Sequence, residues 1–251
     1  MERTLLRTIS GLSTRGFEQK VAFLSSRTDE ILDVTEFAEL IRIVPTKPRD
    51  PQVPWALRKL LRRFTPDVIH ARNWGAWPDV AFARLTLRER PALFFSYHGT
   101  DETQKPSLKR KLAFKFLAET STRILTVADA AADRLAELFP VPRSRIEIVR
   151  DGVDTDYFRP REGGRRPGPF VIGGVGRLMD IKNYPLLLKA AARASKRWPT
   201  LRVRIAGDGY LKDKLQKLGD ELGLGERLEL IGHTENVPEY LQNLDLFVQS
   251  S

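Results

Sequence analysis

The sequence predicts an α/β protein made of two doubly wound, Rossmann-like domains with parallel sheets. Short apolar runs alternate with amphipathic helical segments along almost the whole chain. The runs are apolar without interruption, as in strands that helices cover on both faces. A Gly, Pro and Arg cluster breaks the alternation once, and the pattern then restarts. We therefore expect a first domain at 1–162, a linker at 163–169 and a second domain at 170–251.

In the first half, each expected helix has apolar residues at helical spacing, and each expected strand is a short apolar run. The helix at 53–64 is expected to stop before Pro66, and Asp129 is a candidate N-cap for the last helix. The helices are expected at 2–14, 53–64, 78–87, 105–120 and 129–139, and the strands at 20–24, 40–44, 67–70, 92–97, 123–127 and 146–149.

The second half repeats this order, beginning with a strand. Ligands of doubly wound sheets bind beyond the carboxyl ends of the strands, so functional residues are expected in the loops after strands. The strands are expected at 170–175, 201–206, 228–231 and 244–248, and the helices at 184–197, 210–222 and 237–241.

Composition excludes several kinds of site. The chain has no Cys, which removes disulfides, thiolate nucleophiles, and Cys-ligated zinc or iron–sulfur centres. The three His are scattered, so no His-ligated metal site is predicted. The net charge is +10. Nucleic acid, an anionic membrane face and a phosphorylated substrate are the usual partners of such a charge, and a solvated basic surface is the alternative.

The loop at 173–183 is the richest in chemical signals. Gly176 permits close backbone approach, Arg177 and Lys182 supply two cations, and a helix is expected to start directly afterwards. A helix start beside cations is typical of a phosphate site. A dinucleotide fold is the competing interpretation, but Met179 stands where its third Gly would be, and no acid occurs between Asp180 and Asp208. A third interpretation is a structural Gly turn whose cations are simply exposed to solvent.

Polar residues also follow strands of the first half. His98 and Asp101 follow the strand at 92–97, and Asn73 and Trp74 follow the strand before it. A His at a strand's carboxyl end faces the ligand crevice and can donate to a substrate hydroxyl, although a structural His is an equal alternative. In the second half, His233 follows the strand at 228–231.

Two further patterns allow two interpretations each. Asp154 and Asp156 form a D-x-D triplet, which in some sugar transferases holds a metal, but its surroundings favour a simple turn. Leu108, Leu112 and Phe116 share one face of a basic helix. That helix can lie on anionic lipid, or it can face the core with a solvated basic side, which we favour.

Together, these residues resemble the retaining glycosyltransferase family 4 of GT-B architecture, in particular bacterial sugar transferases of surface-polysaccharide assembly. Each motif is weak alone, but their order and spacing across the chain are specific. The matching segments are 67–70, 97–101, 149–154 with Phe158 and Pro160, 175–178 with Lys182 and Asn183, 206–209, and 231–233 before Val237 and Pro238.

The resemblance implies roles for the candidate residues. Arg177 and Lys182, beside Gly176, match the pair that holds the donor diphosphate and stabilises the departing nucleotide. His98 matches the catalytic crevice histidine near the transferred sugar. The loop at Gly232 and His233 matches the one that borders the nucleobase. The family needs no metal, so a nucleotide-sugar donor is expected as substrate, with no cofactor.

The chain also departs from the family pattern. Asp151 stands where Asn is usual. The family's first strand with its Gly-rich loop, and its E-x7-E carboxylate pair, are not found, so we expect a fragment truncated at both ends, with two incomplete sheets and no transfer activity alone.

The expected function is a cytoplasmic nucleotide-sugar-dependent transferase acting on a saccharide or lipid-linked acceptor, on the inner face of the cell membrane. The alternatives are a non-catalytic relative or fragment that binds nucleotide or an anionic membrane surface, and a basic nucleic-acid-binding protein. No nucleic-acid-binding motif is present, so nucleic acid is not an expected partner.

Overall fold

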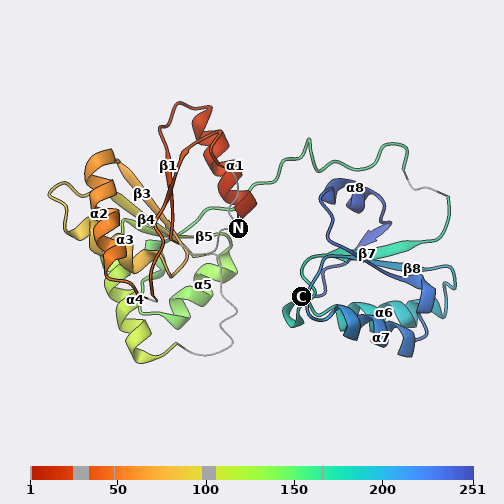
Figure 1. Ribbon diagram of the computed structural model, residues 1–251. Coiled ribbons are helices and arrows are strands. Elements are labelled where there is room, and N and C mark those ends of the chain that lie inside the picture. The colour runs from red at the N-terminus through yellow and green to blue at the C-terminus, as the bar shows by residue number, and fades with distance from the viewer. Residues whose placement is uncertain (1, 25–33, 48, 98–105, 165–166) are drawn as a thin grey trace. The chain divides into compact units, whose positions relative to one another are not determined.

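The computed structural model describes residues 2–24, 34–47, 49–97, 106–164 and 167–251. The chain forms two compact units, Met1–Gly152 and Val153–Ser251 (Figure 1). In both units all paired strands are parallel, which confirms the predicted fold class. The linker expected at 163–169 lies within the second unit and stays a prediction.

The first unit contains a four-stranded parallel sheet in the order β3-β4-β5-β6 and a two-stranded sheet, β1-β2. Since the strands of each sheet are parallel, the carboxyl ends of neighbouring strands lie at one edge. The strands are β1 (Lys20–Phe23), β2 (Glu39–Arg42), β3 (Val68–Arg72), β4 (Ala92–Tyr97), β5 (Arg123–Thr126) and β6 (Ile146–Ile148).

The helices of the first unit connect these strands, and α3 contacts both α2 and α4. None of the described helices has both the length and the apolar content of a membrane span. The helices are α1 (Glu2–Ser13), α2 (Gln52–Phe64), α3 (Trp77–Leu85), α4 (Leu108–Thr120), α5 (Asp129–Leu138) and the short 3-10 helix η1 (Arg143–Arg145).

An aromatic cluster forms the centre of the first core. The Trp77 ring stacks on Phe95 with centroids 3.8 Å apart, and Phe114 stacks on Phe139 at 4.1 Å. Trp77 is fully buried, and its indole N–H donates to the Ser121 hydroxyl at 2.9 Å. That hydrogen bond matters because a buried indole N–H without an acceptor is costly.

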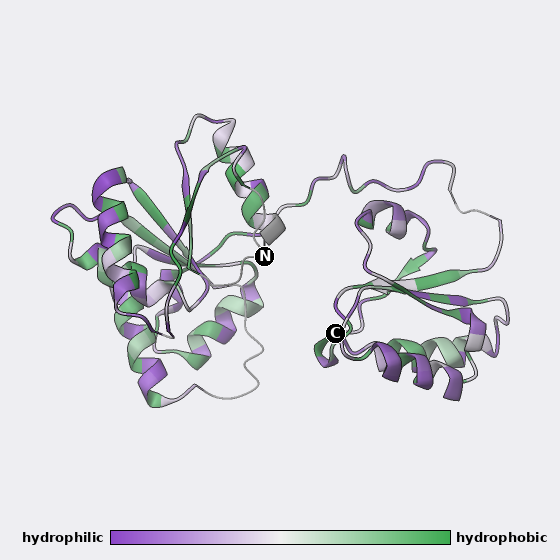
Figure 2. Ribbon diagram, viewed as in Figure 1, coloured by the Kyte–Doolittle hydropathy of each residue, from purple (hydrophilic) through white to green (hydrophobic). Residues whose placement is uncertain are grey.

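The second unit has one parallel sheet in the order β10-β7-β8-β9. Figure 2 shows α6 mainly in hydrophobic colours and α7 mainly in hydrophilic ones. The strands are β7 (Val171–Val175), β8 (Arg202–Ala206), β9 (Leu228–Gly232) and β10 (Leu246–Phe247). The helices are η2 (Asp180–Lys182), α6 (Tyr184–Ser195), α7 (Lys212–Glu221), η3 (Gly225–Arg227) and α8 (Val237–Gln242).

Two local predictions are wrong. Asp129 is not an N-cap: it is the first residue of α5, after Ala128, and its carboxylate instead accepts a hydrogen bond from Arg150 at 2.8 Å. The apolar stripe of α4 does not face the core. Leu108, Leu112 and Phe116 are exposed, because a different set of apolar residues on α4 packs inward.

The turn predicted at the D-x-D triplet is confirmed. One carboxylate oxygen of Asp154 accepts from the backbone N–H groups of Asp156 and Tyr157, at 3.0 Å each. This is the Asx-type turn that an Asp side chain favours. Within the described part of the chain, no three His, Asp or Glu residues come together as a potential metal site.

Candidate functional site

The order of strands in the second unit reverses at β7. β8 and β9 lie on one side of β7, whereas β10, the last strand in the sequence, lies on the other. In a doubly wound sheet such a reversal opens a crevice beyond the carboxyl ends of the two strands. Residues 176–183, predicted above to bind phosphate, follow β7 directly. The predicted loop is therefore located where this type of sheet binds ligands.

Backbone hydrogen bonds join the loops after three strands into one surface. The Leu178 N–H donates to the Asp208 carbonyl at 2.9 Å, which joins the loop after β7 to the loop after β8. The Gly207 N–H donates to the Gly232 carbonyl at 2.6 Å, which joins the loop after β8 to the end of β9. The predicted site residues Gly176 and Gly232 are thus brought to the same edge of the sheet.

The glycines of this surface leave no room for side chains. A Cβ on Gly207 would lie 2.0 Å from the Gly176 carbonyl oxygen, and one on Gly209 would lie 2.4 Å from that of Leu178. Gly207 also has a φ of +139°, which L side chains rarely adopt. Backbone is therefore packed directly against backbone here.

Lys182 is held close to this backbone. It is half-buried, and its Cε lies 3.4 Å from where a Cβ on Gly176 would be. Its carbonyl accepts a hydrogen bond from the Ser250 hydroxyl at 2.7 Å, so the segment after β10 also contacts the loop. The aliphatic part of Lys182 lies along Gly176, as is common for a lysine that keeps its ammonium group accessible.

Neither predicted cation has a carboxylate partner among the residues that the structure describes. Arg177 is exposed, and in the described ranges no Asp or Glu lies within ion-pair distance of Arg177 or Lys182. Asp180, between them in sequence, instead accepts a hydrogen bond from the Tyr210 hydroxyl at 2.5 Å, and this bond raises the pKa of Tyr210. Both positive charges are therefore available to an anionic ligand.

Helix α6 begins at the same loop. Asn183 precedes it in the left-handed conformation, with a φ of +48°, and its side chain does not cap the helix. The Tyr184 hydroxyl donates to the Gly176 carbonyl at 3.3 Å and so closes the loop onto the first turn of the helix. The N-terminus of a helix carries partial positive charge and free N–H groups, both of which favour phosphate.

His233 lies at the border of this surface. It is exposed and follows Gly232, whose φ of +74° turns the chain at the end of β9. The neighbouring Asp208 pairs with Lys212 at 3.6 Å. Beside the phosphate-type loop, this arrangement offers an accessible imidazole next to exposed backbone.

The predicted residues of the first unit are placed only in part. Asn73 is exposed at the carboxyl end of β3 with a φ of +73°. Trp74 is half-buried, stacks on Phe114 at 5.7 Å and has the Arg110 guanidinium 5.1 Å from its ring centroid. Trp74 therefore anchors the loop to the core, and Asn73 is the more accessible group. His98 and Asp101 lie outside the described residues.

Sequence reasoning missed the supporting residues of the site. Tyr184 and Tyr210 close the loop by hydrogen bonds that depend on side-chain direction, which a motif does not reveal. The segment 206–209 is one of the matching motifs, but its role as a packing surface for the β7 loop follows only from the paired strands. The sequence signal that indicates this packing is a pair of glycines in the loop after the neighbouring strand.

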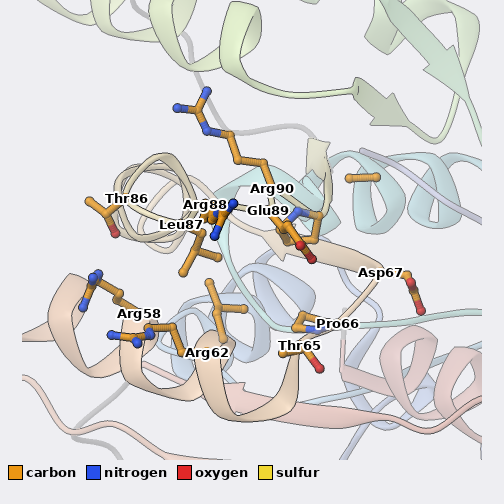
Figure 3. Close-up of a pocket in the computed structure, with 13 residues that line it drawn as sticks. Arg58, Arg62, Thr65, Pro66, Asp67, Thr86, Leu87, Arg88, Glu89 and Arg90 are labelled. Carbon is orange, nitrogen blue, oxygen red and sulfur yellow. The ribbon is translucent and has the colours of Figure 1, made fainter.

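A hollow of about 640 Å³ lies elsewhere, in the first unit (Figure 3). Asp67 and Ala92, which line it, are at the amino ends of β3 and β4, the edge opposite to the one where such sheets bind ligands. Figure 3 shows Arg90 extending away from Arg58 and Arg62. These cations do not converge, so the hollow is not a candidate anion site.

The fold and this loop define a class of protein. Two doubly wound units in series, with a glycine and two cations in the loop at the switch point of the second, are typical of the GT-B fold class. Residues 1–157 match the family model Glycosyltransferase Family 4, and residues 158–251 match Glycosyl transferases group 1. The chain belongs to glycosyltransferase family 4.

Named relatives agree with this assignment. EpsD of Bacillus subtilis, named as a glycosyltransferase, is 25% identical over 233 residues, covering 86% of this chain and 61% of EpsD. The D-inositol 3-phosphate glycosyltransferase of Nocardia farcinica is 28% identical over 264 residues, covering 90% of this chain and 58% of that enzyme. The chain thus spans about three fifths of the length of these curated relatives.

Solved structures share the fold over the whole chain. Anabaena HepE, in complex with UDP and glucose, superposes with a TM-score of 0.79 at 17% identity, covering 100% of this chain and 70% of HepE. The lipopolysaccharide outer core galactosyltransferase WaaB, in its apo form, gives 0.70 at 17% identity, with coverages of 100% and 70%. At such low identity these likenesses show the GT-B fold.

Proposed function

We propose that the whole protein transfers a sugar from a nucleotide-diphosphate donor to a saccharide or lipid-linked acceptor, with retention of the anomeric configuration. The observation that carries the proposal is the loop after β7, where Gly176, Arg177 and Lys182 meet the start of α6 with both cations unpaired by carboxylates in the described chain. A diphosphate matches this arrangement in charge and in hydrogen-bond acceptors.

The chemistry gives the two cations a role in the reaction. The bond between the sugar C1 and the diphosphate oxygen breaks, and its electron pair leaves with the nucleoside diphosphate. The acceptor hydroxyl oxygen bonds to C1 and passes its proton to an oxygen of the leaving diphosphate. Arg177 and Lys182 stabilise the negative charge that develops on the leaving diphosphate. Since they supply the positive charge that a divalent ion would otherwise supply, we expect no metal and no other cofactor.

The remaining candidate residues have proposed places around this step. Gly232 and His233 border the nucleobase, which their position at the end of β9 supports. His98 is the proposed catalytic residue beside the transferred sugar. Asn73, Trp74 and Asp101 are proposed for the acceptor side of the crevice, since they follow β3 and β4.

Binding measurements test the diphosphate site directly. Arg177→Ala and Lys182→Ala are each expected to weaken binding of a nucleoside diphosphate about 10-fold to 100-fold, because a charge-assisted hydrogen bond is worth about 1.5–3 kcal/mol. Binding of the matching nucleoside is expected to change little. Calorimetric titration with UDP, GDP and ADP, and with their nucleosides, measures both and identifies the base.

Lys189→Ala is the matched control, because Lys189 is exposed on α6 away from its first turn. It should leave both affinities unchanged. Equal losses for diphosphate and nucleoside in the Arg177 and Lys182 variants would overturn the assignment. Diphosphate binding that depends on both cations, with no transfer by the whole protein to any acceptor tested, would favour the alternative of a binding protein without turnover.

We further propose a place in bacterial surface-polysaccharide synthesis, in the cytoplasm and on the inner face of the cell membrane. The fold shared with WaaB, a lipopolysaccharide outer core galactosyltransferase, supports this pathway. The D-inositol 3-phosphate glycosyltransferases support a different, small-molecule acceptor. Assays with lipid-linked saccharides and with inositol phosphates side by side separate the two acceptor classes.

A further inference from the structure

One acidic residue lies inside the candidate diphosphate loop. Asp180 stands between Arg177 and Lys182 in the sequence, and no other Asp or Glu occurs in the segment 176–183. Its side chain is exposed, as is that of Arg177. A carboxylate so close to two cations can neutralise them and can also repel a phosphate. The group that holds this carboxylate therefore decides how much positive charge the loop offers to a ligand.

Tyr210, in the loop after β8, holds Asp180 by two hydrogen bonds. The Tyr210 hydroxyl donates to a carboxylate oxygen of Asp180 at 2.5 Å and accepts from the Asp180 backbone N–H at 3.3 Å. The bond to the carboxylate raises the pKa of Tyr210, so the hydroxyl remains a donor at neutral pH. A hydrogen bond to a charged oxygen is also stronger than one between neutral groups. Both the backbone and the side chain of Asp180 are thus tied to one hydroxyl.

Backbone contacts on both sides of Tyr210 place it beside the β7 loop. The Leu211 N–H donates to the Leu178 carbonyl at 3.2 Å. Gly209 packs against the same carbonyl, since a Cβ on it would lie 2.4 Å from the oxygen. Tyr210 itself is 62% exposed. The contact with Asp180, rather than core packing, therefore accounts for the direction of its side chain.

The ion pairs of the site agree with this arrangement. Among the residues that the structure describes, no carboxylate, that of Asp180 included, lies within ion-pair distance of Arg177 or Lys182. Asp208, the next acid along the chain, pairs with Lys212 at 3.6 Å. Both acids of the β7 and β8 loops are thus engaged away from the two predicted cations.

We propose that Tyr210 is a positioning residue of the diphosphate site, which keeps the Asp180 carboxylate away from Arg177 and Lys182. Without the hydroxyl, the Asp180 side chain is free to turn toward either cation and to compete with the diphosphate for it. The inference rests on the proposed function, since it takes these cations to bind the donor diphosphate. Tyr210 acts through Asp180 and needs no contact with the ligand.

Nucleoside diphosphate binding to the Tyr210→Phe variant tests the proposal. This variant loses the hydroxyl and keeps the ring. Calorimetric titration with UDP, GDP and ADP is expected to give an affinity about twofold to fivefold below that of wild type, which corresponds to the strength of an exposed ion pair. The affinity for the matching nucleoside should not change. Asp180→Asn keeps the shape of the side chain without its charge and should bind the diphosphate at least as tightly as wild type.

The double variant separates this role from a structural one. In an Asp180→Asn background, Tyr210→Phe is expected to leave the diphosphate affinity unchanged, because no carboxylate remains to be held. If Tyr210 only stiffened the loop, the loss would be equal in both backgrounds, and that result would overturn the proposal.

Two single variants are matched controls. Tyr157→Phe removes the hydroxyl of another exposed tyrosine, which is 51% exposed in the same unit. Asp220→Asn removes one negative charge from an exposed position near the end of α7. Both should bind the diphosphate as wild type does. An Asp220→Asn gain equal to that of Asp180→Asn would show that net charge alone sets the affinity and would overturn the proposal.

A measurement without nucleotide distinguishes failure of this inference from failure of the proposed function. NMR of isotope-labelled tyrosine follows the ionisation of Tyr210, whose resonance the Tyr210→Phe variant assigns. Asp180→Asn should lower the pKa of Tyr210 toward its ordinary value, because the hydrogen bond to the carboxylate is the main cause of its rise. An unchanged pKa would overturn the inference, whatever the loop binds. Full diphosphate affinity in the Arg177→Ala and Lys182→Ala variants would overturn the proposed function, and this inference with it. Affinity that depends on both cations but not on the Tyr210 hydroxyl would overturn this inference alone.

Discussion

Gly207 is the residue on which the close approach of the β7 and β8 loops depends. Its N–H donates a hydrogen bond to the Gly232 carbonyl. Because Gly207 has no side chain, the Gly176 carbonyl can pack directly against it. Any Cβ there would overlap a backbone oxygen that flexible side-chain motion does not relieve, and its φ of +139° would add strain. The geometry of the candidate diphosphate loop is therefore fixed partly from a neighbouring strand.

Replacing Gly207 by Ala is expected to lower the free energy of unfolding by about 2–4 kcal/mol, because steric overlap and backbone strain add. Nucleoside diphosphate affinity should fall with it, since the Gly176 loop is displaced. Urea unfolding followed by circular dichroism measures the first effect, and calorimetric titration the second.

Gly223 provides the comparison. It has a φ of +71°, but nothing lies within 4 Å of the position that a Cβ would occupy. Gly223→Ala should therefore cost only the left-handed strain, about 1–2 kcal/mol, and leave nucleotide affinity unchanged. Equal losses in the two variants would mean that backbone conformation, and not the contact with Gly176, decides the effect.

The sequence predicted Gly176, Arg177 and Lys182 as a set because glycine, cations and a helix start follow one another within a few residues. The positions of the cations relative to a ligand crevice follow from the strand order β10-β7-β8-β9, which depends on pairing between distant segments. The contact between Gly207 and Gly176 is of the same non-local kind. Motif and spacing therefore predicted the site loop, but not the residues that hold it.

At the level of elements, the beginning of α2 depends on a buried carboxylate. Asp50 accepts hydrogen bonds from the Thr46 hydroxyl at 2.6 Å, from the Gln52 N–H at 2.9 Å and from the Thr46 N–H at 2.8 Å. These bonds, the Thr46 hydroxyl first, lower the pKa of Asp50 from 3.8 to about 2. The charged carboxylate thus ties the loop at residue 46 to the first turn of α2.

This pKa shift predicts a pH dependence of stability. The unfolded chain takes up a proton at Asp50 near pH 3.8, whereas the folded protein does so only near pH 2. Between these values the unfolded state binds more protons, so the stabilisation from Asp50 is complete above about pH 5 and is lost as the pH falls toward 2. Asp50→Asn should remove this part of the pH dependence, and the two proteins should converge in stability at low pH.

Asp79 is controlled for in the same experiment, because burial and the Asp50 charge raise its pKa. Asp50→Asn is therefore compared with its parent in an Asp79→Asn background. Urea unfolding at a series of pH values from about 5 to about 2 gives the difference in free energy. A difference that stays constant over this range would refute a stabilising charge at Asp50.

The apolar pattern predicted most elements within a few residues, because period and length suffice when one apolar face is buried. It failed for α4, where Leu112 and Phe114 belong to opposite faces and both are apolar. Pattern alone does not tell which of two apolar faces packs inward. The N-cap prediction for Asp129 is also wrong, because its carboxylate forms an ion pair with Arg150, a residue far along the chain.

For the whole molecule, the net charge of +10 is the property with the widest consequences. It attracts any polyanion, so binding to nucleic acid at low salt is expected without a dedicated site. Helix α4 also exposes the apolar side chains of Leu108, Leu112 and Phe116, whose contacts would not depend on salt. Salt dependence therefore separates general attraction from a specific surface.

We expect affinity for a random DNA duplex to fall about a thousandfold or more as salt rises from about 50 to about 200 mM, because such binding consists of counterion release. Binding to anionic vesicles, which the proposed place on the inner face of the membrane implies, should fall less over the same range, since Leu108, Leu112 and Phe116 are exposed apolar area. Fluorescence anisotropy with labelled DNA and vesicle sedimentation, both titrated with salt, give the two slopes. DNA affinity that persists at physiological salt would instead favour a nucleic-acid ligand, and with it the interpretation that the family assignment argues against.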